Sequence, residues 1–222
     1  MVELNKKYQI GDRKFGSINW VGFKSLWLKE CNRFISVWQQ TLLSPLVSSL
    51  LFLSVLSLAL GTNRGDVLGY SFISFLAPGL IAMSILTQSF SHSVSSLMIS
   101  KIQGNIVDML YAPLSALEVS LAIILAALTR SFLIAVISIV VFSLIIEIPI
   151  HNVFYILIFG FLGSFILGSI GFITGLWAEK FDHTATITNF IITPLSFLSG
   201  AFYSINKLPE LFQIISYVNP FF

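Results

Sequence analysis

Long apolar runs alternate with short polar connections over most of the chain. A helix that spans a membrane needs about 20 predominantly apolar residues, and the pattern predicts five such spans. They cover residues 42–60, 71–92, 117–146, 153–178 and 185–202. We therefore expect an all-α, polytopic helical membrane protein. Residues 1–41 would form a polar N-terminal part, and residues 42–222 a single transmembrane domain.

Before the first run, aromatic residues recur at steps of three or four, which is the spacing of one helix face. This face holds Trp20, Phe23, Trp27, Cys31, Phe34 and Trp38. The opposite face holds Lys24, Lys29, Glu30, Asn32 and Arg33. Tryptophan rings favour the headgroup level, and basic side chains are attracted to anionic lipids. The pattern predicts an amphipathic interface helix that acts as a membrane anchor, as a contact surface for a partner, or as both.

A second amphipathic pattern lies in the polar connection between the second and third runs. Its apolar positions follow helical spacing at Ile102, Ile106, Met109 and Leu110. Its polar positions are Lys101, Gln103, Asn105 and Asp108. We expect a short helix over residues 101–111 that ends before Pro113. Such a short stripe fits either a docking surface or an ordinary loop that carries this spacing by chance.

The start of the third span is marked by Ser115 and Glu118. These two residues have the spacing of a capping box, in which each side chain binds the backbone N–H of the other residue. We therefore expect a short helix, a turn at Pro113 and a newly capped span to follow one another closely.

Composition agrees with a membrane protein, and the charge pattern adds an orientation. Hydrophobic residues make up 56% of the chain and charged residues 10%, whereas soluble proteins have about 25% charged residues. Of the 12 Lys and Arg residues, those that precede the first span are Lys6, Lys7, Arg13, Lys14, Lys24, Lys29 and Arg33. The positive-inside rule then predicts a cytoplasmic N-terminus. Lys101 and Lys180 would lie on the same side, with Arg64 and Lys207 outside.

Residues 200–220 predict an outer interfacial or re-entrant segment rather than a span. Its apolar stripe of Leu208, Leu211, Phe212 and Ile215 is too short to cross a bilayer. Pro209 suits the first turn of this helix, and Asn219-Pro220 ends it. The chain stops where a further span is due, so we expect that a sixth span is missing through C-terminal truncation.

Few positions inside the spans depart from apolar character. Arg130 is predicted either to face a dimer interface or polar cavity, where it binds backbone or hydroxyl oxygens, or to snorkel to the inner leaflet. Gly171 and Gly175 allow close helix packing, within one subunit or between subunits. Pro194 should kink the fifth span, as a static bend or as a moving joint.

Several kinds of chemistry find no support in the sequence. A G-x-x-x-x-G-K-[ST] phosphate-binding loop is absent, and Cys31 is the single cysteine. His92, His151 and His183 fall in a span, an outer connection and an inner connection, so each is interpreted as a lone polar residue rather than a metal ligand. We expect no catalytic, cofactor-binding or metal-binding residues and no nucleic-acid partner.

Four stretches carry a resemblance to a known family. They are FLAPGLIAMSILTQSF (75–90), KIQGNIVDMLYAPLS (101–115), WAEKFDHTATITNFIITPLSFLSGAFYSINKLP (177–209) and YVNP (217–220). The P-L-S-F-L-S-G stretch at 194–200, followed by a short outer segment and an N-P pair, is the more specific signal. Over nearly its whole length the chain resembles the permease subunit of an ABC type-2 transporter. The nearest branch is that of bacterial nodulation-factor, polysaccharide and drug exporters.

The resemblance implies a role for each part. The short helix would be a coupling helix seated in a cytoplasmic ATPase subunit through Lys101, Ile102, Gln103, Asn105, Ile106, Asp108, Met109 and Leu110. The interface helix, residues 20–39, would contact the same subunit, with Trp20, Trp27, Lys29 and Arg33 as its marked positions. Two permeases and two ATPases would form the working unit in a bacterial inner membrane. The chain departs from the family at Gly104, where relatives often carry a basic residue, and in its missing sixth span.

The function predicted from these features is that of a non-enzymatic permease subunit of an ATP-driven exporter. An ion-gradient-driven secondary transporter is the alternative, although it would favour carboxylates within the spans. A membrane-embedded transferase ranks third, because clustered carboxylates or histidines are not evident. A glycan, a lipid-linked molecule and a drug would all suit the aromatic-rich spans as substrate.

Overall fold

The computed structural model describes residues 18–60, 69–148, 150, 152–203 and 208–221. The elements of regular structure within these ranges are helices. They are α1 (Trp20–Ser36), α2 (Ser44–Leu60), α3 (Phe72–Ile102), α4 (Ile106–Tyr111), α5 (Ala116–Ser143), α6 (Val153–Trp177), α7 (Phe181–Ile187), α8 (Thr193–Phe197) and α9 (Glu210–Val218). π-helical segments at Gln39–Leu43 and Thr188–Ile192 lead into α2 and α8.

Among the described residues, four helices are long and apolar enough to cross a membrane: Gln39–Ala59, Phe72–Ile102, Ala116–Ser143 and Val153–Trp177. They confirm the first four predicted spans, and α3 continues ten residues past the predicted end at residue 92. The fifth predicted span differs, because α7, a π-helical segment and α8 form one helical stretch over residues 181–197. At 1.5 Å per residue this stretch is about 25 Å long, which is short of a hydrocarbon core of about 30 Å.

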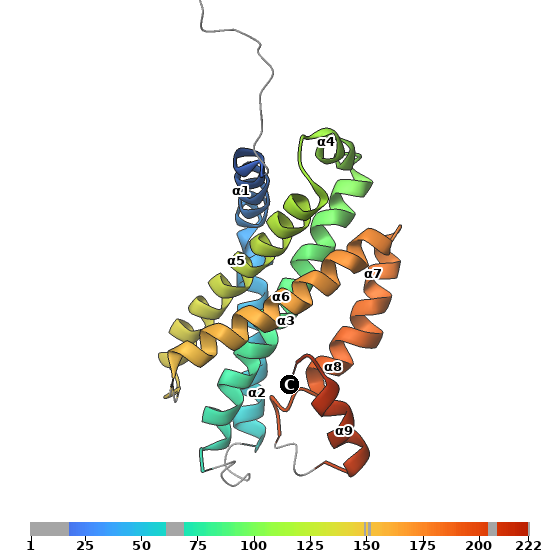
Figure 1. The fold of residues 1–222 in the computed structure, drawn as a ribbon. Helices are drawn as coiled ribbons and strands as arrows, with labels where there is room; N and C mark the ends of the chain where they lie inside the picture. Colours follow the sequence, from blue (N-terminus) through green and yellow to red (C-terminus); the bar gives the residue numbers. More distant parts are fainter. Residues whose placement is uncertain (1–17, 61–68, 149, 151, 204–207, 222) are drawn as a thin grey trace, which may run out of the picture.

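Helix α3 is the central element of the fold, with α2, α5 and α6 packed around it (Figure 1). One apolar cluster joins α2, α3 and α5 around Leu53, Leu76 and Phe142. A second cluster joins α3 to α6 and to the end of the described chain, through Phe90, Leu167 and Phe221. The shared helix α3 therefore holds both halves of the bundle.

Close packing between α3 and α6 depends on glycine. A Cβ built on Gly175 would lie 3.0 Å from the Cβ of Leu97, and one built on Gly171 would overlap the carbonyl oxygen of Phe90. Both glycines face α3 of the same chain. This confirms the interpretation in which they pack within one subunit.

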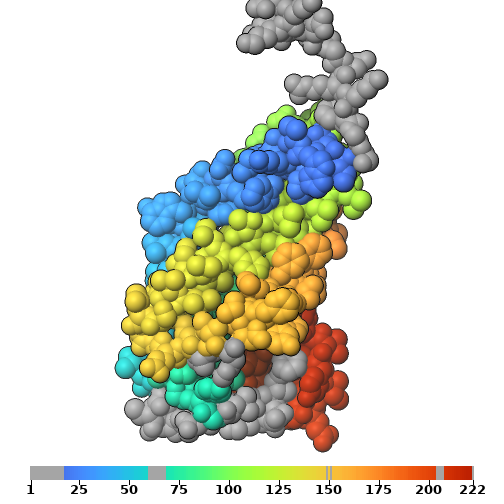
Figure 2. All heavy atoms as spheres, turned by 60° about the vertical axis from the view of Figure 1, so that its left-hand side comes forward, coloured from blue at the N-terminus to red at the C-terminus, as the bar shows by residue number. Residues whose placement is uncertain are grey.

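Helix α1 lies across α5 on the surface of the bundle (Figure 2). Trp27, Cys31 and Phe34 pack against Ala126 of α5, so the centre of the predicted aromatic face is in contact with protein. Burial also raises the pKa of the Cys31 thiol. The outer ends of that face do not share this contact, since Trp20 is 67% and Trp38 51% exposed.

The placement of Glu30 on the polar face of α1 was wrong. Glu30 is only 2% exposed, because it points towards the bundle and accepts hydrogen bonds from Arg33 and Ser96. A carboxylate can occupy such a position when charged and hydroxyl donors satisfy it there.

The described C-terminal part contains the predicted short amphipathic helix as α9. Pro209 is its N-cap residue and Asn219 its C-cap residue, so Pro209 precedes the first turn that it was predicted to occupy. The Asn219 side chain donates to the carbonyl oxygen of Leu195 at 2.7 Å. This bond ties the end of α9 back to α8.

The connections separate into two ends of the bundle (Figure 1). Helices α1 and α4 and the α6–α7 connection lie at one end, and α9 lies at the other. Lys24 and Lys29 belong to α1 and Lys180 to the α6–α7 connection, and Lys101 at the end of α3 binds the carbonyl oxygens of Leu176 and Ala178 beside that connection. Other residues used in the charge and histidine arguments lie outside the described residues: Lys6, Lys7, Arg13, Lys14, Arg64, His151 and Lys207.

Candidate functional site

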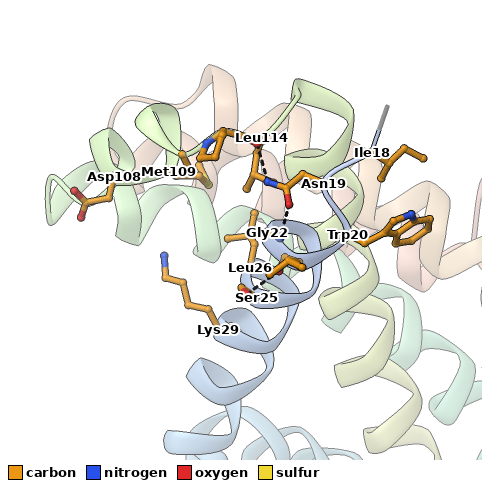
Figure 3. A pocket seen from close by; sticks show the side chains of 13 residues that line it. Ile18, Asn19, Trp20, Gly22, Ser25, Leu26, Lys29, Asp108, Met109 and Leu114 are labelled. Atoms are coloured by element: carbon orange, nitrogen blue, oxygen red, sulfur yellow. Dashed lines mark hydrogen bonds between the residues drawn. The ribbon is translucent and has the colours of Figure 1, made fainter. Parts of the chain in front are cut away.

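A groove of about 960 Å³ separates the N-terminal half of α1 from α4 (Figure 3). Its walls are mainly apolar, and they are formed by Ile18, Trp20, Val21, Leu26, Met109, Ala112, Pro113 and Leu114 together with a few polar residues. Lys29 reaches into it from α1, and Asp108 lines it from α4. The groove thus combines exposed apolar surface with one charge of each sign.

The short helix beside this groove is smaller than the single helix predicted over residues 101–111. Lys101 and Ile102 form the end of α3, and α4 contains only residues 106–111. Gly104 separates the two helices with φ of +77°, a left-handed conformation that glycine adopts without steric penalty. The turn gives a structural reason for glycine at this position.

The predicted coupling residues have different surroundings in the structure. Ile106 and Met109 are half-buried, whereas Ile102 is 56% and Leu110 75% exposed. The Asn105 side chain donates to Gln103 on the exposed turn. The apolar positions therefore do not form one buried face.

Lys101 is already bound within the chain. Its Nζ donates to the carbonyl oxygens of Leu176 at 2.6 Å and Ala178 at 2.9 Å, at the C-terminal end of α6. A cation is favourable there because the last carbonyl groups of a helix carry partial negative charge. Lys101 links α3 to α6, although the sequence pattern placed it on the polar face of a separate short helix.

Three polar residues join α1 to the start of α5. The capping box is confirmed, with Ser115 N–H donating to Glu118 Oε2 at 2.7 Å and the Glu118 N–H donating to Ser115 Oγ at 3.3 Å. The other oxygen of Glu118 accepts from the backbone N–H of Asn19, and the Asn19 side chain donates to the carbonyl oxygen of Pro113 at 3.0 Å. Asn19 also caps α1 by accepting from Gly22. Sequence reasoning found the box but missed Asn19, whose position as N-cap of an amphipathic helix was the available signal.

A second hollow lies at the opposite end of α1 and is lined mainly by polar side chains. It has a volume of about 560 Å³. It is bounded by Arg33, Phe34, Val37, Gln40, Thr41, Ser44, Pro45, Ser48, Ser49, Ser84, Gln88, Ser91, His92, Ser95, Ile99 and Arg130. These residues come from α1, the π-helical segment that follows it, α2, α3 and α5. We refer to it as the polar cavity.

Arg130 lines the polar cavity and is 8% exposed. Its Nη2 donates to the side-chain oxygen of Gln88 at 2.6 Å and to the carbonyl oxygen of Thr41 at 3.3 Å. In a regular α-helix the N–H of residue 45 would donate to the carbonyl oxygen of Thr41, but Pro45 has no N–H. Arg130 supplies a donor to this carbonyl oxygen instead. Gln88 is a partner that the sequence pattern did not reveal.

Glu30 does not line the polar cavity itself but contacts Arg33 and His92, which do. Its Oε2 accepts from Arg33 Nε at 2.9 Å and from Ser96 Oγ at 2.8 Å, and it lies 3.9 Å from His92 Nε2. His92 is fully buried, and its ring meets Phe34 edge to face with centroids 5.7 Å apart. Arg33, predicted on an interfacial polar face, is therefore directed to the bundle.

The remaining marked positions are also located. Trp27 donates to Thr129 Oγ1 of α5 at 3.4 Å. Pro194 lies in the first turn of α8, directly after the π-helical segment, where Thr193 N–H donates back to the Thr188 carbonyl oxygen. Within the part of the chain that the structure describes, no group of three or more His, Cys, Asp and Glu residues could hold a metal ion.

The polar cavity and most residues of the groove lie within the region matched by a known family. The family model described as "ABC-2 type transporter" matches residues 21–222. The chain belongs to the ABC-2 type transporter family. The similar "Inner membrane transport permease YadH" of Escherichia coli strain K12 is 30% identical over 201 residues, which are 90% of this chain and 78% of that protein.

Further ABC-2 relatives extend the comparison. "Nodulation protein J" of Rhizobium leguminosarum bv. trifolii is 27% identical over 200 residues, covering 89% of this chain and 75% of its own length. The corresponding protein of Neorhizobium galegae is 23% identical over 206 residues, covering 92% and 78%. The ABC-2 chain described here is thus a helical transport permease of the membrane, in agreement with the resemblance seen in its sequence.

Proposed function

We propose that this chain is the permease subunit of an ATP-driven exporter and receives force from an ATPase subunit through the groove between α1 and α4. The observation that carries the proposal is the position of α4, a short exposed helix between two long membrane helices of an ABC-2 permease. A displacement of α4 would act on α3 through the Gly104 turn and on α5 through the capped start at Ser115.

The surface of the groove supports a protein partner. Large apolar side chains that stay exposed beside charged ones are typical of interaction sites. Val107, Leu110 and Tyr111 on α4 are 48%, 75% and 86% exposed, and Trp20 and Val21 on α1 are 67% and 76% exposed. Lys29 and Asp108 add a charge of each sign, which favours one orientation of a partner.

The finer features of the proposal follow the family expectation. Two copies of the permease bind two ATPases, the substrate path runs between the copies, and the end with α1 and α4 faces the cytoplasm. The excess of basic residues before the first span supports this orientation. The name of the YadH relative supports location in a bacterial inner membrane.

Buried Glu30 is the one observation that favours the gradient-driven alternative. A carboxylate with 2% exposure lies next to His92 on α3, and buried ionisable groups are common in proton-coupled transporters. Transport into vesicles separates the two mechanisms. The exporter requires ATP and persists when a protonophore collapses the gradient, whereas the secondary transporter loses activity with the gradient.

A site-specific photo-cross-linker tests the coupling surface. We place benzoylphenylalanine at Tyr111 on α4, irradiate membranes and identify adducts by mass spectrometry. The proposal expects an adduct with an ABC ATPase, because Tyr111 is 86% exposed beside the groove. The matched control places the same group at Val218 on α9, which is 82% exposed at the other end of the bundle.

The same experiment includes a double substitution in the groove. Asp108→Ala with Met109→Ala should lower the yield of the Tyr111 adduct, whereas Glu210→Ala with Leu211→Ala on α9 should leave it unchanged. Equal adduct yields from positions 111 and 218, or an ATPase bound only at position 218, would contradict the proposal.

A further inference from the structure

We propose that the polar cavity binds a phosphate group through Arg33 and Arg130. The cavity lies beside α2, α3 and α5, three of the helices that are long and apolar enough to cross a membrane. Polar and charged groups at such positions are unfavourable unless they have partners or a function. Its lining nevertheless gathers serine, glutamine and arginine side chains from several elements.

The two guanidinium groups have donors to spare. Glu30 binds Arg33 at Nε, and Arg33 Nη2 is buried without a hydrogen-bond partner. Thr41 and Gln88 bind Arg130 at Nη2, and Arg130 Nε is also buried without a partner. Unpaired buried donors of a charged group carry a large free-energy penalty. An oxyanion in the cavity would remove this penalty once the guanidinium groups turn these donors towards it, because each of its oxygens accepts hydrogen bonds.

The charge of the lining favours an anion over other ligands. Arg33 and Arg130 are the charged residues among the lining residues, none of which is Asp or Glu. Glu30 offsets one positive charge from behind Arg33, so the group keeps a net positive charge. A cation would be repelled, and a neutral sugar would leave this charge unmatched.

The neutral side chains around the arginines also suit a phosphate group. Ser44, Ser48, Ser49, Ser84, Ser91 and Ser95 all line the same cavity. The Ser95 hydroxyl donates to the carbonyl oxygen of His92, and the Ser49 and Ser84 hydroxyls share one hydrogen bond, so Ser44, Ser48, Ser91 and one member of that pair remain as donors. Hydroxyl groups donate to oxyanions without requiring a counter-charge. Arginine is the side chain whose planar fork best matches the geometry of phosphate oxygens.

Size and location indicate an amphiphile as the source of the phosphate. The cavity volume of about 560 Å³ falls within the range of about 300 to 1,000 Å³ typical of small-molecule sites. It therefore has room for a headgroup larger than a bare ion. An amphiphile can place its phosphate among membrane-spanning helices while its chains lie beside the bundle, whereas a free ion has no such attachment to the membrane.

Native mass spectrometry of the purified full-length chain tests the site. Dioleoyl phosphatidylglycerol, dioleoylglycerol and inorganic phosphate are added separately to wild type and to Arg33→Gln, Arg130→Gln and Arg130→Lys. Lys24→Gln on the exposed face of α1 is the matched control. Each variant is first passed through size-exclusion chromatography, so that only the folded fraction is measured.

The proposal expects phosphatidylglycerol to bind the wild type and the Lys24 variant alike, and dioleoylglycerol not to bind. Loss of one guanidinium should weaken phosphatidylglycerol binding by about tenfold, with partial recovery in Arg130→Lys. If millimolar inorganic phosphate competes with phosphatidylglycerol, the phosphate site is supported and the free ion is a sufficient ligand for it. Binding that is unchanged in both arginine variants, or equally strong for dioleoylglycerol, would overturn the proposal. If Arg130→Gln fails to fold, Arg33→Gln, which alters a 27% exposed side chain, decides the result.

Discussion

The groove between α1 and α4 and the polar cavity lie at the two ends of one helix and have opposite linings. The N-terminal half of α1 borders a mainly apolar hollow that opens next to exposed α4. The C-terminal end of the same helix borders a hollow among membrane helices, most of whose lining residues are polar. Water around α4 would favour a polar lining, and a membrane around the long helices would favour an apolar one, so each lining is the opposite of what its environment favours.

This contrast shows that the polarity of a cavity lining must be compared with the polarity of the medium around it. Apolar surface in contact with water indicates a missing protein partner, whereas polar surface at membrane depth indicates a polar ligand. Because α1 borders both hollows, a change at one can reach the other through a single rigid element. The following substitutions separate the two.

Glu30→Ala should have the largest effect and act on the polar cavity alone. Breaking a buried charge pair costs about 3 to 5 kcal/mol, and we expect the lower end because Arg33 is 27% exposed. Thermal unfolding in detergent should show a lower midpoint. Glu30→Gln is the control, since it keeps an acceptor for Ser96 and should lose less. A Glu30→Ala protein as stable as wild type would mean that this carboxylate does not hold Arg33 in the cavity wall.

Gly171→Ala should destabilise the packing of α6 against α3, the central helix of the bundle. The added methyl group would overlap the carbonyl oxygen of Phe90, and overpacking of this kind costs about 1 to 3 kcal/mol. Unfolding in detergent measures the loss. Gly160→Ala is the matched control on the same helix, because its Cβ would lie 3.6 Å from Phe132 in ordinary contact. Equal midpoints for the two variants would remove the argument for close α3–α6 packing.

Glu118→Ala should act on the groove and leave the polar cavity intact. It removes the capping box and the acceptor of the Asn19 N–H, and loss of a helix cap costs about 1 kcal/mol. Hydrogen–deuterium exchange should become faster at Asn19 and Ser115. Glu118→Gln retains a capping side chain and should exchange almost as slowly as wild type. Faster exchange at Arg130 instead would show that the two hollows are not separable.

Gly104→Ala should have the smallest effect on stability, confined to the α3–α4 turn. Placing a side chain at φ of +77° costs about 1 kcal/mol. The unfolding midpoint should fall slightly, and cross-linking from position 111 should fall more. Gly104→Asn should be milder, because asparagine enters the left-handed region more readily. An unchanged cross-link would mean that this turn does not set the position of α4.

Much of the scaffold could be predicted from the sequence. The first four spans, the capping box at Ser115 and the glycine packing of α6 follow from local patterns. Each depends on run length, residue spacing or residue size within one segment. Such signals do not require knowledge of which segments meet.

The interior of the candidate sites could not be predicted in the same way. Glu30 appeared polar and therefore exposed, yet Ser96 and Arg33 make its burial possible. Lys101 was placed on the polar face of the short helix, yet its Nζ binds carbonyl oxygens at the end of α6. Arg130 donates to Gln88 on α3 and to the carbonyl oxygen of Thr41, which Pro45 cannot bind because it has no N–H. Each outcome depends on a partner from another segment, which spacing along one helix does not specify.

The bond between Asn19 and Glu118 also sets an order of events during synthesis. The two residues are 99 positions apart, and chains grow from the N-terminus at about 5 to 20 residues per second. The ribosome therefore synthesises the start of α1 about 5 to 20 s before it synthesises Glu118 at the start of α5, to which Asn19 binds. During that interval the part of its aromatic stripe that later packs on Ala126 of α5 has not yet met that helix. Tryptophan rings favour the headgroup level of a membrane, so Trp20 and Trp38 would hold α1 at the membrane surface until α5 is inserted and packs against it.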